Sequence, residues 1–352
     1  MISIFSEKDG LPTPYTRALT RSKDGALWVS LISDQADDPY WGIARIVMNR
    51  NEPVIRLYDE PSGLRPGQVN DLIVASDGRL WAATNSGLYY FDDNEQFVLT
   101  GSSRPMLALA VALDHSLWAW GGDQGEYWLA RITGKVVAQS APFAAYHQPF
   151  CLLPVSPDMV WFICRAGILY GSFDSLQSVE LDETPLFVSP PAEAESDIPS
   201  VWLYAAALNQ AGMLFLAGHS QQLVRVQAGH FESIASGAFA DIVGDNSDTM
   251  FVSDFSGKLF RLQGEELQLL LDVEAEGEIG TTYLDRPGSL WIEIQRRNAP
   301  HQIVQMKPPY KHAKRWALET EDGFLSPGVF RMVEDGAGGI YVSTNRGIWH
   351  LH

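Results

Sequence analysis

The stretch VNDLIVASDGRLWAATNSGLYY, residues 69–90, contains the pattern that decides the fold. An apolar run leads into the dipeptide Asp77-Gly78, and a second apolar run follows it up to a turn marked by Gly87. Asp-Gly between two apolar runs is the strongest short-range signal for a β-hairpin. The stretch therefore predicts three consecutive antiparallel strands, and residues 96–100 supply a fourth.

The same unit, a turn followed by an apolar strand with an aromatic residue, recurs at a period of about 40 residues. Eight copies are present, with their aromatic residues at Trp28, Trp81, Trp118, Trp161, Phe215, Phe251, Trp291 and Tyr341. We expect these aromatic side chains to fill the gaps between neighbouring units. Four strands per copy, arranged radially, make a β-propeller. The sequence therefore predicts an all-β fold, a single β-propeller of four-stranded blades, with eight blades and seven as the alternative.

The two ends of the chain predict how the propeller closes. The last copy ends after its third strand, residues 347–352, whereas residues 3–6 form a strand without a partner of their own. An open ring would leave exposed sheet edges. We therefore expect residues 1–9 to complete the last blade together with residues 323–352, and residues 1–352 to form a single domain.

Composition limits the possible partners. The chain has 43 acidic and 25 basic residues, a formal net charge of -18, so it repels phosphate backbones and no nucleic-acid partner is expected. No apolar run is long enough to span a bilayer, and none is expected to do so. The first residues lack the basic region and long apolar stretch of a signal peptide, which leaves the compartment open.

The two cysteines, Cys151 and Cys164, flank an expected hairpin with its turn at Pro157-Asp158. Counting outward from the turn places them opposite each other. A disulfide between adjacent antiparallel strands tends to be strained, so two reduced thiols are favoured over a bond.

Beyond its strand pattern, the repeat resembles the two-component regulator propeller repeat family, whose members form sensor regions of bacterial signalling proteins. The matching segments are Gly10-Leu11-Pro12 with Asp24-Gly25-Ala26-Leu27-Trp28, Gly63-Leu64 with residues 77–88, and Gly323-Phe324 with residues 339–348. The asparagine that usually follows in the family is absent, with Pro14, Gly67 and Pro327 at or near its place. The resemblance implies a sensor domain outside the cytoplasm, whose output module lies elsewhere; a cytoplasmic location is the alternative.

Propeller ligands usually meet the loops of one face, namely the loops between second and third strands and the connections into each first strand. Aromatic and polar side chains around a concavity suit a sugar, a peptide or another small molecule. The long first-blade loop, residues 33–41, is the preferred contact because long loops on rigid scaffolds tend to carry function. The predicted ligand-binding residues are Asp38, Tyr40, Trp41, Arg65, Arg104, His147, Arg165, Asp254, Arg296 and Asn345.

No spacing in the sequence indicates catalysis or a metal site. A Gly-x-Ser-x-Gly elbow is absent, His350 and His352 share a strand face without a zinc-binding spacing, and a calcium site at Asp34, Asp37 and Asp38 is the weaker alternative to a solvated loop. We therefore predict no enzyme, no metal and no cofactor. The predicted function is a ligand-binding sensor propeller working with a signalling partner or a separate output domain. A protein-interaction scaffold is the alternative, and a propeller lyase is less favoured.

Overall fold

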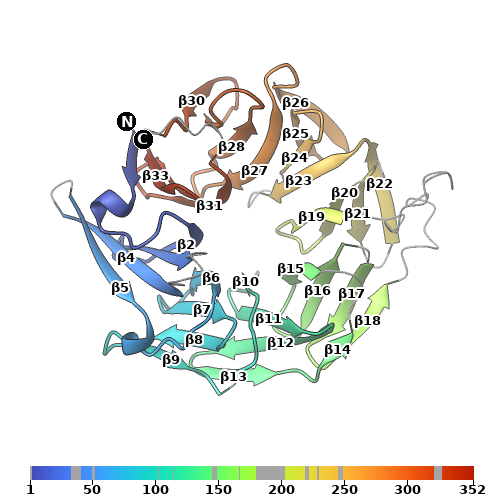
Figure 1. The fold of residues 1–352 in the computed structure, drawn as a ribbon. Helices are drawn as coiled ribbons and strands as arrows, with labels where there is room; N and C mark the ends of the chain where they lie inside the picture. Colours follow the sequence, from blue (N-terminus) through green and yellow to red (C-terminus); the bar gives the residue numbers. More distant parts are fainter. Residues whose placement is uncertain are drawn as a thin grey trace. The chain divides into compact units, whose positions relative to one another are not determined.

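The computed structural model describes residues 2–32, 41–49, 52–101, 103–112, 114–144, 149–165, 167–179, 203–218, 222–227, 230–244, 249–320 and 327–352. Across these residues the chain forms eight blades of four antiparallel strands and no α-helix (Figure 1). The fold is a β-propeller with eight blades, which confirms the predicted fold and decides between eight and seven. No helix in this described part is long and apolar enough to cross a membrane.

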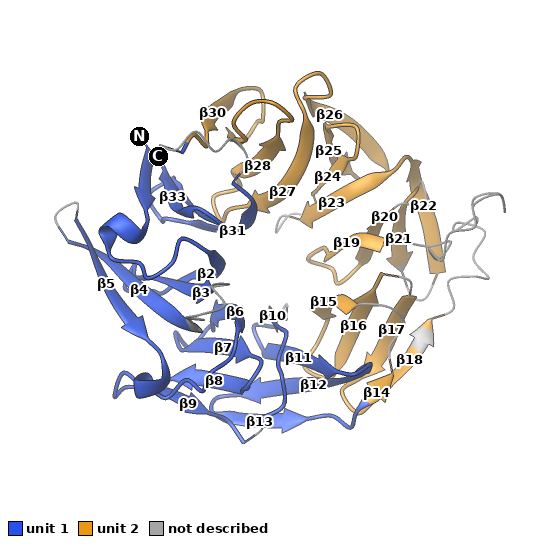
Figure 2. Cartoon of the chain, viewed as in Figure 1, with its two compact units in different colours: residues 1–142, 320–352 blue, residues 143–319 orange. Residues whose placement is uncertain are grey.

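The chain divides into two compact units, each with four blades (Figure 2). Unit 1 comprises Met1–Pro142 and Thr320–His352, and unit 2 comprises Phe143–Glu319. That residues 1–352 form a single domain stays a prediction.

Unit 1 contains the first three blades and the last one. In its last blade the strand order is β1-β33-β32-β31. Two short 3₁₀ helices, η1 (Glu7–Asp9) and η2 (Glu60–Ser62), lie in its connections. Its strands are β1 (Ile2–Phe5), β2 (Thr16–Arg21), β3 (Leu27–Ile32), β4 (Trp41–Asn49), β5 (Glu52–Tyr58), β6 (Val69–Val74), β7 (Leu80–Thr84), β8 (Gly87–Phe91), β9 (Phe97–Leu99), β10 (Ala108–Val111), β11 (Leu117–Asp123), β12 (Glu126–Thr133), β13 (Val136–Gln139), β31 (Val329–Glu334), β32 (Ile340–Thr344) and β33 (Gly347–Leu351).

Unit 2 contains the short strand β14 and four blades, β15–β18, β19–β22, β23–β26 and β27–β30, whose strands follow one another along the chain. Its strands are β14 (Phe143–Ala144), β15 (Pro149–Pro154), β16 (Met159–Cys164), β17 (Gly167–Ser172), β18 (Ser175–Val179), β19 (Leu203–Leu208), β20 (Leu214–Gly218), β21 (Gln222–Gln227), β22 (His230–Ser236), β23 (Phe239–Gly244), β24 (Met250–Asp254), β25 (Lys258–Gln263), β26 (Glu266–Asp272), β27 (Glu278–Leu284), β28 (Leu290–Gln295), β29 (Gln302–Met306) and β30 (Ala313–Ala317).

The N-terminal strand completes the last blade. β1 pairs antiparallel with β33, from Ile2 opposite Leu351 to Phe5 opposite Ile348. Phe5 is buried, and its ring lies 6.4 Å from that of Tyr341. The blade is therefore assembled from both ends of the chain, which confirms the predicted closure by the N-terminal strand.

The repeated aromatic residues form the core between neighbouring blades. All eight are buried, and none is more than 8% exposed. Trp28 belongs to the same apolar cluster as Leu72 and Phe97 of the next blade, and Trp81 packs in a cluster with Trp128 of the blade after that. In these blades the second strand presents a large ring toward the following blade, so the repeat spacing itself builds the core there, as expected.

Two aspartates link the first strands of neighbouring blades. The Asp71 carboxylate accepts a hydrogen bond from the backbone N–H of Leu109 at 3.0 Å. Asp241 accepts one from the Thr282 N–H at 3.1 Å and another from the Thr282 hydroxyl. Burial raises the pKa of Asp241 above its usual range, although the bonds from Thr282 and from the Ile242 N–H lower it.

The predicted pairing of Cys151 with Cys164 is wrong. A register shift in β15 places Pro149 opposite Cys164, and Cys151 opposite Ile163. The register is one residue off the prediction from the turn outward, where Pro154 already faces Val160, because the hairpin is centred on Pro157 and not between Pro157 and Asp158. A β-bulge between Pro149 and Cys151 then shifts the partner of Cys164 by one more residue. Both thiols are free, as favoured, and burial raises the pKa of each to about 12.

Candidate functional site

A cavity of about 620 Å³ opens between the last two blades of unit 2. Its walls come from the β24–β25 turn, the connection from β26 into β27, and the β28–β29 loop. These are the kinds of loop in which the sequence predicts ligand contacts; we call them the loop face of unit 2. The lining residues are Phe255, Ser256, Glu274, Ala275, Glu276, Gly277, Glu278, Arg296, Arg297, Asn298 and Ala299.

Asp254 shapes the turn beside this cavity and does not line it. Its Oδ1 accepts hydrogen bonds from the Ser256 N–H at 3.0 Å, the Ser256 hydroxyl at 2.9 Å and the Lys258 N–H at 2.8 Å. An aspartate that bonds to backbone N–H groups two and four residues on fixes a tight turn. The turn leaves Phe255 with 41% of its surface exposed at the cavity wall.

The glutamates of the cavity are each paired with a basic residue. The pairs are Glu274 with Lys258 at 2.9 Å, Glu276 with Arg315 at 2.6 Å, and Glu278 with Arg297 at 3.3 Å. Exposed pairs of this kind add little stability, but they balance the local charge.

Arg296 is the predicted site residue that lines this cavity. Its Nε–H group is buried, and among the described residues it has no hydrogen-bond partner. A buried donor without a partner costs free energy that an acceptor would recover. The guanidinium can therefore take a carboxylate or hydroxyl oxygen from a bound molecule.

Aromatic rings extend the loop face beyond the cavity. Tyr204 and Phe255 meet edge to face at 4.9 Å between ring centroids. The predicted residue Arg165 lies over Phe150 at 4.6 Å and over Tyr204 at 5.4 Å. It also donates to the Leu203 carbonyl at 2.9 Å, so its charge packs between two blades.

Three other predicted residues lie in unit 1. Arg65 is exposed in the connection into β6, and Arg104 stands over the Trp128 ring at 5.2 Å beside a cavity of about 490 Å³. Asn345 accepts a hydrogen bond from the Gly328 N–H at 3.0 Å, so it holds the connection into β31. None of these three residues is among those that line the cavity of unit 2.

The remaining predicted residues lie outside the described part of the chain. These are Asp38, Tyr40 and His147, together with Asp34 and Asp37 of the calcium alternative. Trp41 begins β4, but its side chain is also outside the described part.

Sequence reasoning missed the cavity residues Phe255, Glu274, Glu276 and Glu278. Of these four residues, Phe255 could have been predicted from the sequence. It lies in a loop between a second and a third strand, one of the loops in which ligand contacts are expected. The glutamates stand in or next to a connection without any repeat signature.

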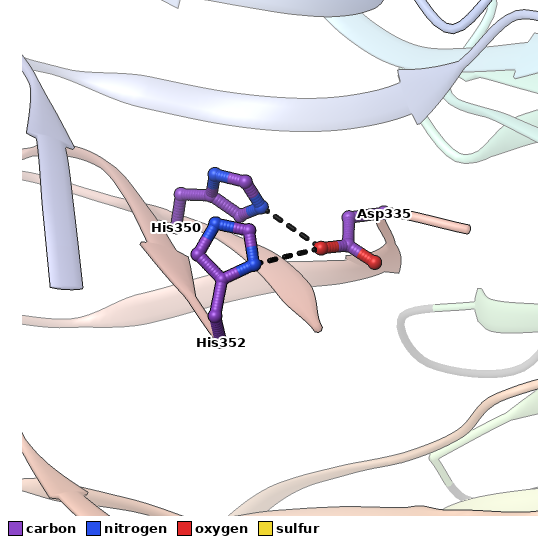
Figure 3. Close-up of side chains that lie close together, drawn as sticks. All are labelled: Asp335, His350 and His352. Carbon is purple, nitrogen blue, oxygen red and sulfur yellow. Dashed lines mark hydrogen bonds and ion pairs between the residues drawn. The ribbon is translucent and has the colours of Figure 1, made fainter. Parts of the chain in front are cut away.

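A second group lies at the other end of the last blade of unit 1, away from the β32–β33 turn. Asp335 Oδ2 lies 3.0 Å from Nε2 of His350 and 3.2 Å from Nδ1 of His352 (Figure 3). Burial acts to raise the pKa of Asp335, but hydrogen bonds from His350 and from the Ala337 and Gly339 amides outweigh it and hold it well below the usual range.

Comparisons with known proteins show the fold and not the function. No family model matches the chain, and no curated protein matches its sequence. The computationally designed protein Ika8 is similar in structure, with a TM-score of 0.65 and 10% identity over 97% of this chain and 96% of that one. Virginiamycin B lyase from Staphylococcus aureus is similar with a TM-score of 0.53 and 12% identity over 84% of this chain and 96% of that one.

A bacterial extracellular domain is a weaker structural match. The extracellular domain of a putative one-component system from B. thetaiotaomicron has 13% identity and a TM-score of 0.44. The alignment covers 97% of this chain and 59% of that one.

Proposed function

We propose that the chain is the ligand-binding part of a bacterial signalling system and recognises a sugar, a short peptide or another small polar molecule on the loop face of unit 2. The observation that carries this proposal is the cavity itself. It combines a buried Arg296 N–H without a partner among the described residues with the exposed ring of Phe255.

The cavity chemistry favours a ligand with both an acceptor group and an apolar face. Arg296 offers directed donors to a carboxylate or hydroxyl, whereas Phe255 offers a flat surface for C–H groups. Since the three glutamates are already paired with cations, the charge of Arg296 is left for the ligand. A cavity of about 620 Å³ has the size of ordinary small-molecule sites.

The signalling role rests on the resemblance of the three repeat segments to the two-component regulator propeller repeats. In such a system the chain works outside the cytoplasm and passes its state to a signalling partner or an output domain. In this proposal the ligand is bound without being chemically changed.

A thermal-shift screen tests the proposal with simple sugars, uronic acids, amino acids and short peptides as probes. The hit is then titrated against the wild type, Arg296→Gln and Phe255→Ala. The matched control is Arg56→Gln, an exposed arginine on β5 that pairs with Glu95. We expect the two cavity variants to keep their melting temperature and lose at least about tenfold in affinity, or about 1.4 kcal/mol.

Two results would overturn this assignment. One is a hit whose affinity is the same in Arg296→Gln as in the control. The other is a chain with no small-molecule hit that forms a stable complex with a protein partner, which would favour the scaffold alternative.

A further inference from the structure

The last blade differs from the others at one repeated position. In every blade the aromatic residue of the second strand lies opposite a residue of the third strand. These pairs are Trp28 with Arg45, Trp81 with Tyr90, Trp118 with Arg131, Trp161 with Tyr170, Phe215 with Arg225, Phe251 with Arg261, Trp291 with Gln305, and Tyr341 with His350. Among these eight described pairs, the last alone has an imidazole.

This imidazole stands beside the carboxylate of the turn between first and second strands. In the first blade Arg45 occupies the position of His350 and forms an ion pair at 2.7 Å with another carboxylate of that turn, Asp24, whereas Ser22 stands at the position of Asp335. The first blade therefore uses the position for a salt bridge, and arginine cannot ligate a metal ion because it has no free electron pair to offer. In the last blade His350 takes the place of the arginine, and an imidazole nitrogen is a common metal ligand.

A second imidazole joins the first from the same strand face. His352 lies two residues after His350, and both ring nitrogens point at the same carboxylate oxygen, Asp335 Oδ2 (Figure 3). The three donor atoms all lie within 4.8 Å of one another. His350 is held flat against Tyr341, with the ring centroids 4.0 Å apart, so its orientation is fixed.

The carboxylate is oriented by its other oxygen. Asp335 Oδ1 accepts the Ala337 N–H at 2.7 Å and the Gly339 N–H at 2.9 Å, which turns Oδ2 toward the imidazoles. Backbone donors of this kind position a ligating carboxylate in metal sites.

Gly339 keeps the space next to these donors open. A Cβ at this position would lie 2.5 Å from Asp335 Oδ2 and 3.1 Å from His352 Nδ1, besides 2.3 Å from the Leu351 carbonyl oxygen. Any larger residue would therefore fill the region beside the converging donors.

We infer that Asp335, His350 and His352 form a binding site for a divalent transition-metal ion of the zinc class. Ligands about 2.0–2.2 Å from a shared ion lie roughly 2.9–3.5 Å apart when they are neighbours in its coordination shell. The separations of 3.0 and 3.2 Å from Oδ2 to the two nitrogens fit this range. Imidazole with carboxylate suits zinc, copper or nickel better than calcium or magnesium, which prefer oxygen ligands.

The exposure of the site permits entry of an ion. The His352 side chain is 42% exposed, whereas those of His350 and Asp335 are 10% and 3% exposed. Three protein ligands leave a coordination position for water. An ion there would connect the β31–β32 turn to the end of β33, the strand that pairs with β1. It would thus fasten the blade formed by both chain ends, whatever ligand the cavity in unit 2 binds.

The experiment measures Zn²⁺ and Co²⁺ binding to the full chain without a polyhistidine tag, after chelator treatment and in excess Mg²⁺. The excess Mg²⁺ occupies weak acidic surface sites. We expect one Zn²⁺ per chain by calorimetry, a rise in melting temperature on adding Zn²⁺, and visible Co²⁺ absorption. The test variants are His352→Gln, which changes an exposed side chain, and Asp335→Asn. The matched control is His312→Gln, which replaces an exposed histidine outside the cluster.

The outcomes separate a metal site from a hydrogen-bonded Asp–His pair. His352→Gln is expected to keep the chelator-treated melting temperature but lose the Co²⁺ spectrum and at least about 100-fold in Zn²⁺ affinity, because even an outer-sphere partner is worth about 10–100-fold. The inference is overturned if Zn²⁺ does not bind the wild type, or if His352→Gln and His312→Gln bind Zn²⁺ equally well. A failure of this test leaves the cavity in unit 2 unaffected.

Discussion

The blade β27–β30 and the last blade use the same turn carboxylate for different purposes. In β27–β30, Asp285 accepts the Ser289 N–H at 2.6 Å with one oxygen and the Trp291 indole N–H at 2.9 Å with the other. In the last blade, Asp335 binds turn amides in the same way with one oxygen, but its other oxygen meets His350 and His352.

The difference follows from one change in the repeat. A tryptophan carries its own N–H donor to the turn carboxylate, whereas the tyrosine at the matching position 341 has no indole N–H and stacks on His350. The oxygen left free by the missing indole is then available to other donors. A repeat protein can thus gain a new polar site in one blade without altering the backbone of the others.

The two blades also differ in how their fourth strand is supplied. In β27–β30 it follows directly along the chain, while in the last blade it is β1 from the other end. Deleting residues 1–9 should therefore uncover the edge of β33 and remove the buried ring of Phe5. We expect a loss of roughly 4–6 kcal/mol in the free energy of unfolding from lost burial and strand pairing, with aggregation through the open edge.

Thermal melting with light scattering checks this prediction, with deletion of residues 1–2 alone as a milder control. An unchanged melting curve for the longer deletion would mean that β1 contributes nothing to the last blade, which would remove this difference between the blades.

Replacing the repeated aromatic residue with alanine measures how much its packing stabilises each blade. Trp291 is completely buried and stacks on Trp316 at 5.5 Å, whereas Tyr341 is 7% exposed. We expect Trp291→Ala and Trp81→Ala each to lower the free energy of unfolding by about 3–5 kcal/mol. Tyr341→Ala should lower it by less. Urea unfolding measures all three, and a loss below about 1 kcal/mol for Trp291→Ala would contradict the packing described for this blade.

Smaller substitutions isolate the hydrogen bond. Trp291→Phe keeps a ring but leaves the buried Asp285 oxygen without its indole donor, so we expect a loss of about 1–3 kcal/mol. Tyr341→Phe should cost less, under about 1 kcal/mol, because Asp335 takes its bonds from the imidazoles and turn amides. Equal losses in urea unfolding would show that the turn carboxylates of the two blades are not used differently.

The fold could be predicted because each repeat of the sequence specifies both its own hairpin and one of its core side chains. A turn followed by an aromatic residue such as Trp81 specifies a hairpin and also supplies the ring between blades, so local and tertiary requirements coincide. The N-terminal strand could be assigned because the last copy stops after its third strand. Register within one hairpin was less predictable, since the turn residues between Pro154 and Val160 do not show on which residue the hairpin is centred, and the bulge beyond Cys151 leaves no clear sequence mark.

The candidate sites were less accessible to sequence reasoning than the fold. Arg296 was found because it follows a second strand, but whether its Nε–H has a partner among the described residues depends on neighbours distant in sequence. Asp335 and His350 form no linear motif and become adjacent only through strand pairing. An alignment of the repeats that compared the turn carboxylate with the third-strand residue could have predicted that Asp335 and His350 are neighbours.

Carboxylates with and without a neighbouring cation should differ in how they make stability depend on pH. We expect this change in stability to be the smallest of those predicted here. Burial opposes ionisation of Asp24, but hydrogen bonds from Ser22 and Arg45 lower its pKa below the ordinary value. Burial dominates at Asp241, whose partners are neutral, and raises its pKa. These two groups should therefore give opposite slopes when stability is measured against pH.

For Asp241 the folded state favours the protonated form, so its contribution is fully present below the ordinary pKa of 3.8 and is lost as pH rises through the folded value. Asp241→Asn should then gain stability relative to the wild type as pH increases from about 3.8 toward neutrality. For Asp24 the contribution is present above the ordinary pKa of 3.8 and is lost as pH falls through the lower folded value. Asp24→Asn should therefore lose stability relative to the wild type as pH rises from acid values toward about 3.8, so the two windows together run from acid pH to neutrality. Melting temperatures of the wild type and both variants across this pH range give the two slopes, and any constant offset from a changed hydrogen bond cancels in them. Slopes of the same sign would mean that the neighbouring cation does not set the direction of the pKa shift of these carboxylates. The difference between blades in the partners of their carboxylates would then rest on geometry alone.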